Sequence, residues 1–118
     1  MRTVEIEVLQ SQAALQAFKK AWREAERGEE VVPRIGFESW AEVFSAITEK
    51  RLEIIGFVLE HKGLNTRQIA KMLDRDYKNV YMDVQALVEV GLLDKDSRGR
   101  ISAPFDEIVI RAGLRDAA

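Results

Sequence analysis

The spacing of apolar positions over residues 65–91 predicts two helices joined by a short turn. Asn65 followed by Gln68 is typical of the capping box that begins a helix. Asp76 has the same N-cap character, and Gly91 is a typical helix stop. The apolar positions between them recur at helical spacing: Val80, Val84, Leu87 and Val88. A short helix, a tight turn and a longer helix form the helix-turn-helix pattern, whose second helix can enter a DNA major groove.

The residues before this pattern predict a strand and three further helices. Residues 3–9 alternate apolar with polar side chains, which indicates a half-buried strand. Ser11 can cap a helix that runs to about Arg27, and residues 28–37, with two glycines and a proline, read as a connection. Two capped helices are expected next, the first opened by Ser39 with Glu42 and the second running from Thr48 through His61. Their expected inward positions are Trp40, Val43, Phe44 and Ile47, then Leu52, Ile55, Val58 and Leu59.

The residues after Gly91 predict a hairpin. Its expected arms are residues 92–96 and 100–103, around a polar tip at 97–99, and residues 105–111 read as a further short strand. A helix-turn-helix followed directly by a hairpin is a winged helix. We therefore expect a mainly helical α+β fold with an N-terminal strand–helix arm (1–36), a winged helix-turn-helix domain (37–112) and a flexible tail (113–118).

The first long helix has an apolar stripe that includes Leu15, Phe18 and Trp22. Such a stripe usually packs on the core of its own chain. The alternative is a dimer interface, and the two are compatible if the arm packs on a second subunit.

Composition narrows the possible chemistry. The chain has 118 residues, a net charge of −2, one histidine and no cysteine, which excludes disulfides and thiolate metal sites. No signal peptide or transmembrane run is visible, so a cytoplasmic protein is expected. No phosphate-binding glycine loop, metal-ligand spacing or nucleophile–histidine arrangement is present, so we expect neither an enzyme nor a cofactor. Acidity argues against strong DNA binding, but residues 61–100 carry eight basic against six acidic residues, a local charge of +2.

Two stretches, FESWAEVFSAITEKRLEII (37–55) and NTRQIAKMLDRDYKNVYMDVQALVEVGLL (65–93), resemble the MarR-like winged-helix family of predicted transcriptional regulators. The matching residues are Ser39, Thr48, Lys50, Arg51, Leu52, Arg75, Asp76, Asn79, Val80, Asp83, Val84, Leu87, Gly91 and Leu92. The resemblance implies sequence-specific DNA binding, and some relatives resemble antitoxins. Many relatives have glycine where this chain has Asp74, a residue that tolerates the left-handed turn conformation better than most. The match at Asp83 suggests a salt bridge with Arg51 or Arg75.

The helical spacing and the helix-turn-helix motif together predict which residues contact DNA. On the outer face of the second helix, amides suit adenine, lysine suits guanine and methionine suits the thymine methyl group. These residues are Tyr77, Lys78, Asn79, Tyr81, Met82 and Gln85. Expected phosphate contacts from the first helix, the turn and the wing are Thr66, Arg67, Gln68, Lys71, Arg75, Arg98 and Arg100. Each alone could equally be an ordinary solvated surface residue.

Two functions remain open at this point. The first is a homodimeric regulator, expected to be a repressor, that binds a palindromic operator in double-stranded DNA. The arm or a terminal strand must then set the half-site spacing. The second is an antitoxin that neutralises a toxin protein encoded by the adjacent gene and represses its own operon. A ligand pocket lined by Trp22, Trp40 and Phe44 is a further possibility, although such aromatics are more often core. No contact with a membrane is expected.

Overall fold

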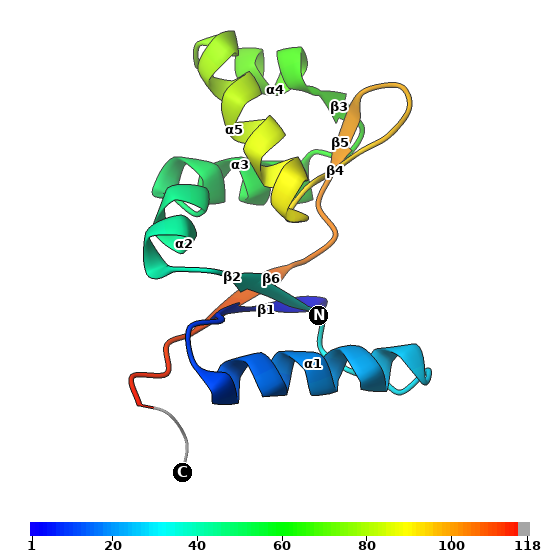
Figure 1. Cartoon of the computed structure of the whole chain (residues 1–118). Coiled ribbons are helices and arrows are strands. Elements are labelled where there is room, and N and C mark those ends of the chain that lie inside the picture. Colours follow the sequence, from blue (N-terminus) through cyan, green and yellow to red (C-terminus); the bar gives the residue numbers. More distant parts are fainter. Residues whose placement is uncertain (116–118) are drawn as a thin grey trace. The chain divides into compact units, whose positions relative to one another are not determined.

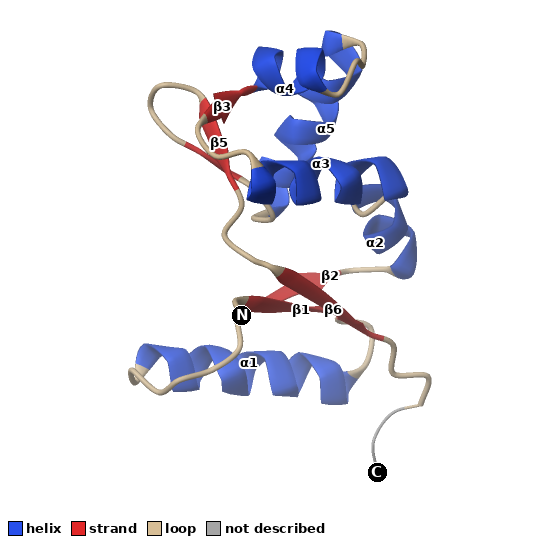
Figure 2. Ribbon diagram, turned by 180° about the vertical axis from the view of Figure 1, so that it is seen from behind, coloured by secondary structure: helices blue, strands red, loops and turns tan. Residues whose placement is uncertain are grey.

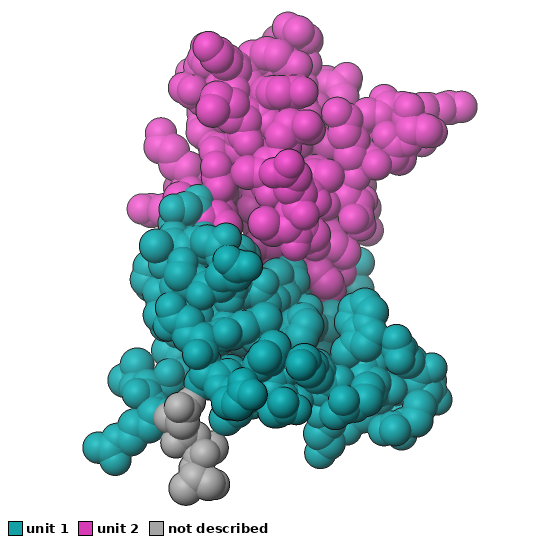
Figure 3. Space-filling view, in the orientation of Figure 1, with its two compact units in different colours: residues 1–45, 107–118 teal, residues 46–106 magenta. Residues whose placement is uncertain are grey.

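The chain forms two compact units in the computed structural model, which describes residues 1–115 (Figure 1). Unit 1 comprises residues 1–45 and 107–118, and unit 2 comprises residues 46–106 (Figure 3). The described residues form five helices and six strands, and the strands make two three-stranded sheets. The expected mixed α+β class is therefore confirmed.

Unit 1 is built on a parallel sheet in which β1 (Thr3–Val8) is the central strand. Its neighbours are β2 (Arg34–Phe37) and β6 (Glu107–Arg111), and both run parallel to it. The helix α1 (Gln12–Glu26) lies along one face of this sheet (Figure 1 and Figure 2). A second helix, α2 (Trp40–Ala46), follows β2.

The two faces of β1 differ in character. Val4 and Ile6 are fully buried on one face, and Glu7 is on the other. Gly36 pairs with Glu7, and a Cβ atom at Gly36 would lie 3.3 Å from the Phe18 ring of α1. The helix α1 therefore covers the charged face of the sheet.

This placement changes the reading of the apolar stripe on α1. No residue of α1 is buried. Leu15 and Phe18 are half-buried, whereas Trp22 is 62% exposed and its Nε1 donates to Glu26 at 2.7 Å. Packing against the chain's own core therefore accounts for Leu15 and Phe18 in part, and it was the wrong interpretation for Trp22.

The interpretation of residues 28–37 as a connection was also wrong in its last part, because Arg34–Phe37 form β2. The strand has only four residues, and one of them is Gly36, which weakens any β-strand pattern in the sequence. Its pairing partner is β1, a strand about 30 residues earlier that local patterns do not reveal.

Unit 2 contains three helices whose starts were predicted correctly. Helix α3 (Glu49–Glu60) begins after Thr48, whose side chain accepts from the Arg51 amide. Helix α4 (Thr66–Met72) opens with a complete capping box between Asn65 and Gln68. Helix α5 (Tyr77–Val90) begins after Asp76 and ends at Gly91, which has a φ of 88°.

The predicted hairpin is present in unit 2 as the strands β4 (Asp94–Lys95) and β5 (Arg100–Ser102). A third strand, β3 (Leu64–Asn65), pairs antiparallel with β5 and so ties the start of α4 to the hairpin. The buried apolar residues of the unit are Ile54, Ile55, Val58, Ile69, Ala70, Val80, Val84, Leu87, Leu92, Leu93, Ile101 and Ala103.

Two predicted inward positions were wrong. Phe44 is 65% exposed and Leu52 is 45% exposed. On α3 the inward face is centred on Ile54, Ile55 and Val58, and Leu52 lies off this stripe. Val43, Ile55 and Val58 are buried as predicted, and Trp40, Ile47 and Leu59 are half-buried.

The unit boundaries differ from the expected ones at residues 36 and 112. Helix α2, up to residue 45, and strand β6 belong to unit 1. The strand joins unit 1 because five of its residues pair with β1. The expected tail is described only over residues 113–115, and residues 116–118 lie outside the described residues.

Candidate functional site

The turn between α4 and α5 sets where α5 starts. Asp74 adopts a φ of 53°, as its position in the turn predicted. The Asp74 amide donates to the Lys71 carbonyl at 3.2 Å, and the Arg75 amide donates to the Ala70 carbonyl at 3.0 Å. These two hydrogen bonds close the end of α4 in the Schellman pattern, with aspartate where glycine is usual. The Asp76 side chain then accepts from the Asn79 amide at 3.1 Å and opens α5.

A three-residue ion cluster holds α5 to the rest of unit 2. Asp83 accepts from Arg51 Nε and from Arg75 Nη2, each at 3.0 Å. All three side chains are only 19% exposed. Arg51 Nη1 also donates to the Ala46 carbonyl at 3.1 Å. The predicted salt bridge of Asp83 is therefore confirmed, and it uses both arginines.

The outer face of α5 is exposed over its first half. Tyr77, Tyr81 and Met82 are 38%, 40% and 58% exposed, while Val80 and Val84 are fully buried. The other nominated residues of this helix are also exposed: Lys78, Asn79 and Gln85. The division into an inner and an outer face follows the helical spacing of the sequence.

The first turn of α4 joins this surface. The Arg67 guanidinium lies over the Tyr77 ring, 4.2 Å from its centroid, and the Tyr77 and Tyr81 rings are 6.0 Å apart. Lys71 on the same helix is exposed. We call this continuous surface of α4 and α5 the α4–α5 face; it comprises Arg67, Lys71, Tyr77, Lys78, Asn79, Tyr81, Met82 and Gln85.

Three other nominated residues are committed to contacts within the chain. Thr66 is only 8% exposed, and the Gln68 side chain accepts from the Asn65 amide in the capping box. Arg75 is bound to Asp83, and its Nη1 atom is buried without a hydrogen-bond partner. The structure therefore gives Arg75 a role inside unit 2, as the partner of Asp83 that the family resemblance suggested.

The hairpin tip is organised by Asp96. Its Oδ1 atom accepts from the Arg98 and Arg100 amides, each at 2.9 Å, and its Oδ2 atom accepts from Arg100 Nε at 2.9 Å. The hydrogen bond from the Arg100 amide is the main reason why the pKa of Asp96 lies below its ordinary value; the Arg98 amide and the Arg100 guanidinium act in the same direction. The charge of Arg100 is thus balanced at the tip, and Arg98 is exposed.

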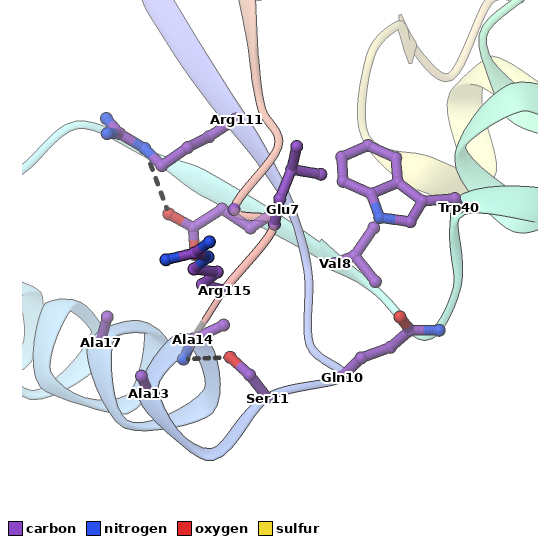
Figure 4. Close-up of a pocket in the computed structure, with 12 residues that line it drawn as sticks. Glu7, Val8, Gln10, Ser11, Ala13, Ala14, Ala17, Trp40, Arg111 and Arg115 are labelled. Carbon is purple, nitrogen blue, oxygen red and sulfur yellow. Dashed lines mark hydrogen bonds and ion pairs between the residues drawn. The ribbon is translucent and has the colours of Figure 1, made fainter. Parts of the chain in front are cut away.

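Unit 1 contains a separate cavity of about 450 Å³ (Figure 4). One wall is the small-residue side of α1, with Ala13, Ala14 and Ala17, and the opposite walls include Glu7 and Trp40. A second cavity of about 500 Å³ in this unit includes Trp22 in its lining. Phe44, which the sequence placed with these tryptophans, lines neither cavity.

Two of the charged residues that line the first cavity, Glu7 and Arg111, take part in ion pairs. Glu7 is buried and accepts from Arg34 Nη1 at 2.8 Å, and Arg111 Nε lies 4.0 Å from the same Glu7 oxygen. Glu5 contacts the same two arginines, at 3.7 Å and 3.3 Å. These four residues, here called the sheet ion cluster, join all three strands of unit 1. Their arrangement is that of a structural network between strands.

Neither a metal-ligand group nor a membrane-spanning helix is found in the part of the chain that the structure describes. No group of three histidine, aspartate or glutamate side chains is placed to hold a metal ion within residues 1–115. None of the helices over the same residues is long and apolar enough to cross a membrane. The exposed groups on the α4–α5 face are cations, amides and aromatic rings.

Comparison with known protein families identifies a family for this chain. No curated protein and no solved structure matches the chain. Residues 46–110 match the family HVO_A0114. This match covers unit 2 and continues into β6, which together make up more than half of the chain. The chain therefore belongs to the HVO_A0114 family.

Proposed function

We propose that unit 2 is a winged helix-turn-helix domain, similar to those of MarR-like regulators, and that the protein binds double-stranded DNA to regulate transcription. In this proposal α4 and α5 form the helix-turn-helix, α5 is the recognition helix and the β4–β5 hairpin is the wing. The observation that carries the proposal is the exposed α4–α5 face on a helix that Asp83 holds in place.

The α4–α5 face carries the side chains that direct readout needs. Lys78 suits guanine, Asn79 and Gln85 suit adenine, and Met82 suits the thymine methyl group. Lys78 and Gln85 are seven residues apart, two helical turns on one face, so a single major groove can take both. Arg67 is held over Tyr77 and presents its charge at the start of α4.

Phosphate contacts are assigned to the flanking cations. Lys71 and Arg98 are exposed, and Arg100 contributes less because Asp96 balances it. Arg75 is removed from this set because it serves Asp83. Because few cations are assigned to phosphates and the net charge is −2, we expect moderate affinity per subunit. We also expect the protein to act as a repressor that binds a palindromic operator as a homodimer.

The test is binding to the DNA upstream of the protein's own gene, measured by fluorescence anisotropy against a scrambled duplex. Lys78→Ala is expected to reduce the preference for the operator by roughly 10-fold, because a lysine–guanine contact is lost. Lys19→Ala is the matched control, since it removes the same charge from an exposed position on α1 in unit 1. A wild-type protein that binds both duplexes equally, or a Lys78→Ala variant that keeps the full preference, would refute the proposal.

A second candidate is an antitoxin that covers a small toxin encoded by the adjacent gene. The exposed Tyr81 and Met82 favour it, because large apolar side chains on a surface are typical of protein contacts. Co-expression with the neighbouring gene product distinguishes the two. A stable complex that Met82→Glu disrupts supports the antitoxin, and a neighbour that never co-purifies argues against it.

A further inference from the structure

Strand β6 has an open edge. It is an outer strand of the sheet β2-β1-β6, and among residues 1–115 only β1 pairs with it. The Glu107 amide donates to the Arg2 carbonyl on the side of β1. Because backbone groups alternate along a strand, those of Ile108 and Ile110 point to the open edge. Val109 and Ile110 are 37% and 44% exposed.

The sequence of β6 is self-complementary. It reads EIVIR, with a glutamate at one end, an arginine at the other and Val109 in the middle. If a second copy runs antiparallel about Val109, Glu107 lies opposite Arg111 of the second copy and Ile108 lies opposite Ile110. Opposite charges and β-branched side chains are favourable partners at such positions.

The hydrogen-bonding pattern fits the same register. In an antiparallel pair, hydrogen-bonded and non-bonded residue pairs alternate. With Val109 on the two-fold axis, the hydrogen-bonded pairs are Ile108 with Ile110 of the other copy, and these are the residues whose backbone groups face the open edge. The order of the charges and the direction of the backbone groups are independent observations, and both favour the antiparallel register centred on Val109.

The opposite edge of the sheet lacks these properties. Strand β2 reads RIGF, so self-pairing would place Arg34 against Phe37 of the second copy. Arg34 is moreover engaged with Glu5 and Glu7 in the sheet ion cluster. At β6, Arg111 also contacts Glu5 and Glu7, but its side chain is 62% exposed, compared with 27% for Arg34. Glu107 is exposed and accepts from the Thr3 hydroxyl at 3.0 Å, so both charges at the ends of β6 are accessible.

We propose that two copies of the chain associate through β6, in antiparallel register centred on Val109, and so form a continuous six-stranded sheet. An unpaired apolar edge strand is a template for such pairing, and β6 has no proline or lysine to block it. This interface gives the proposed regulator its homodimer, yet it does not depend on DNA binding. It replaces the α1 stripe of Leu15, Phe18 and Trp22 as the dimer surface.

The register is tested by cysteine cross-linking without DNA. The chain has no cysteine, so each variant carries a single thiol. Val109→Cys is expected to form an intermolecular disulfide under mild oxidation, because the non-bonded pair on the axis has a Cα separation of about 4.5 Å, within disulfide range. Trp22→Cys is the matched control on α1, exposed to a similar or greater degree.

Cross-linking at least tenfold faster for Val109→Cys than for Trp22→Cys supports the proposal. Faster cross-linking of Trp22→Cys, equal rates, or no cross-linking in either variant overturns it. Because no DNA is present, a failure here leaves the DNA-binding proposal to its own anisotropy measurement.

A charge series provides a second, independent readout by analytical ultracentrifugation. Glu107→Lys places like charges opposite each other and is expected to raise the dimer dissociation constant at least tenfold, while Glu107→Gln has a smaller effect. Added salt should weaken the wild-type dimer and strengthen that of Glu107→Lys, because it screens attraction in one and repulsion in the other. Unchanged association in Glu107→Lys would contradict the β6 interface.

Discussion

The carboxylate of Asp83 on α5 accepts a hydrogen bond from Nε of Arg51 on α3, at 3.0 Å. The same carboxylate binds Arg75 in the turn before α5. One acidic residue therefore sets the position of α5 relative to both α3 and the turn. If α5 shifted, all the side chains on its outer face would shift with it. The two contacts of Asp83 therefore help to fix the position of the α4–α5 face.

Asp83→Ala is expected to lower the free energy of unfolding by about 3 kcal/mol, because it removes the shared counter-charge of two largely buried guanidinium groups. Urea denaturation followed by circular dichroism measures this loss. Asp94→Ala is the control, since Asp94 is exposed, and it should change stability by less than about 0.5 kcal/mol. Equal effects of the two substitutions would show that the Asp83 cluster contributes nothing.

The positive φ of Asp74 predicts an unequal response to substitution. Asp74→Val should destabilise the protein by about 1–2 kcal/mol, because a β-branched side chain clashes with the backbone in the left-handed conformation. Asp74→Gly should be neutral or slightly stabilising, because glycine has no Cβ atom. The midpoint of thermal unfolding compares the two. A valine variant as stable as the glycine variant would contradict the strained turn.

The sheet ion cluster predicts a large stability effect in unit 1. Glu7→Ala should cost about 2 kcal/mol, because it removes a charge-assisted hydrogen bond of 2.8 Å between a buried carboxylate and Arg34, while Glu5 remains as a second partner of Arg34. Glu29→Ala, which removes an exposed pair with Arg27, should cost less than about 1 kcal/mol. The comparison uses urea denaturation again. If the two substitutions lowered the free energy of unfolding equally, the effect would come from the change in net charge and not from the sheet ion cluster.

The hairpin tip should respond to acid in a defined direction. The Arg100 and Arg98 amides stabilise the ionised Asp96 carboxylate, so the pKa of Asp96 in the folded protein lies below its ordinary value of 3.8. This stabilisation is fully present above the ordinary value and is lost as pH falls through the lower folded value. Amide proton shifts of Arg98 and Arg100 in an NMR titration should therefore change only below about pH 4. Asp96→Asn should abolish that change, and a transition well above pH 4 would contradict the assignment.

The β4–β5 hairpin, which is the wing in the proposed function, should contact DNA through phosphates. Arg98→Ala is expected to weaken binding to operator and scrambled DNA alike, and to reduce the log–log salt slope by about 0.9 for the one lost contact. Arg100→Ala should reduce the slope less, because Asp96 already balances that charge. Equal slopes for the wild type and Arg98→Ala would remove the wing from the DNA interface.

Local patterns determined the helices of unit 2 by themselves. The caps at Thr48, Asn65 and Asp76 are contacts between residues three apart, and the left-handed turn at Asp74 depends on its own backbone. The division of α5 into a buried and an exposed face follows from helical periodicity alone. Such features are readable in the sequence because all their partners lie within one or two turns.

The tertiary structure alone decided the rest. The parallel sheet of unit 1 joins strands from both ends of the chain, and Arg111 reaches Glu5 across 106 residues of sequence. Residues 34–37 form a strand only because they pair with β1. Pairing with β1 also places β6 in unit 1, outside the domain expected from the sequence, and α1 covers the charged face of the resulting sheet. Among residues 1–115 the pairing leaves one edge of β6 free. The fold of unit 2, separately, commits Arg75 to Asp83. Hydrogen bonds and ion pairs between distant segments carry no periodic signal, because each depends on where folding places the other partner.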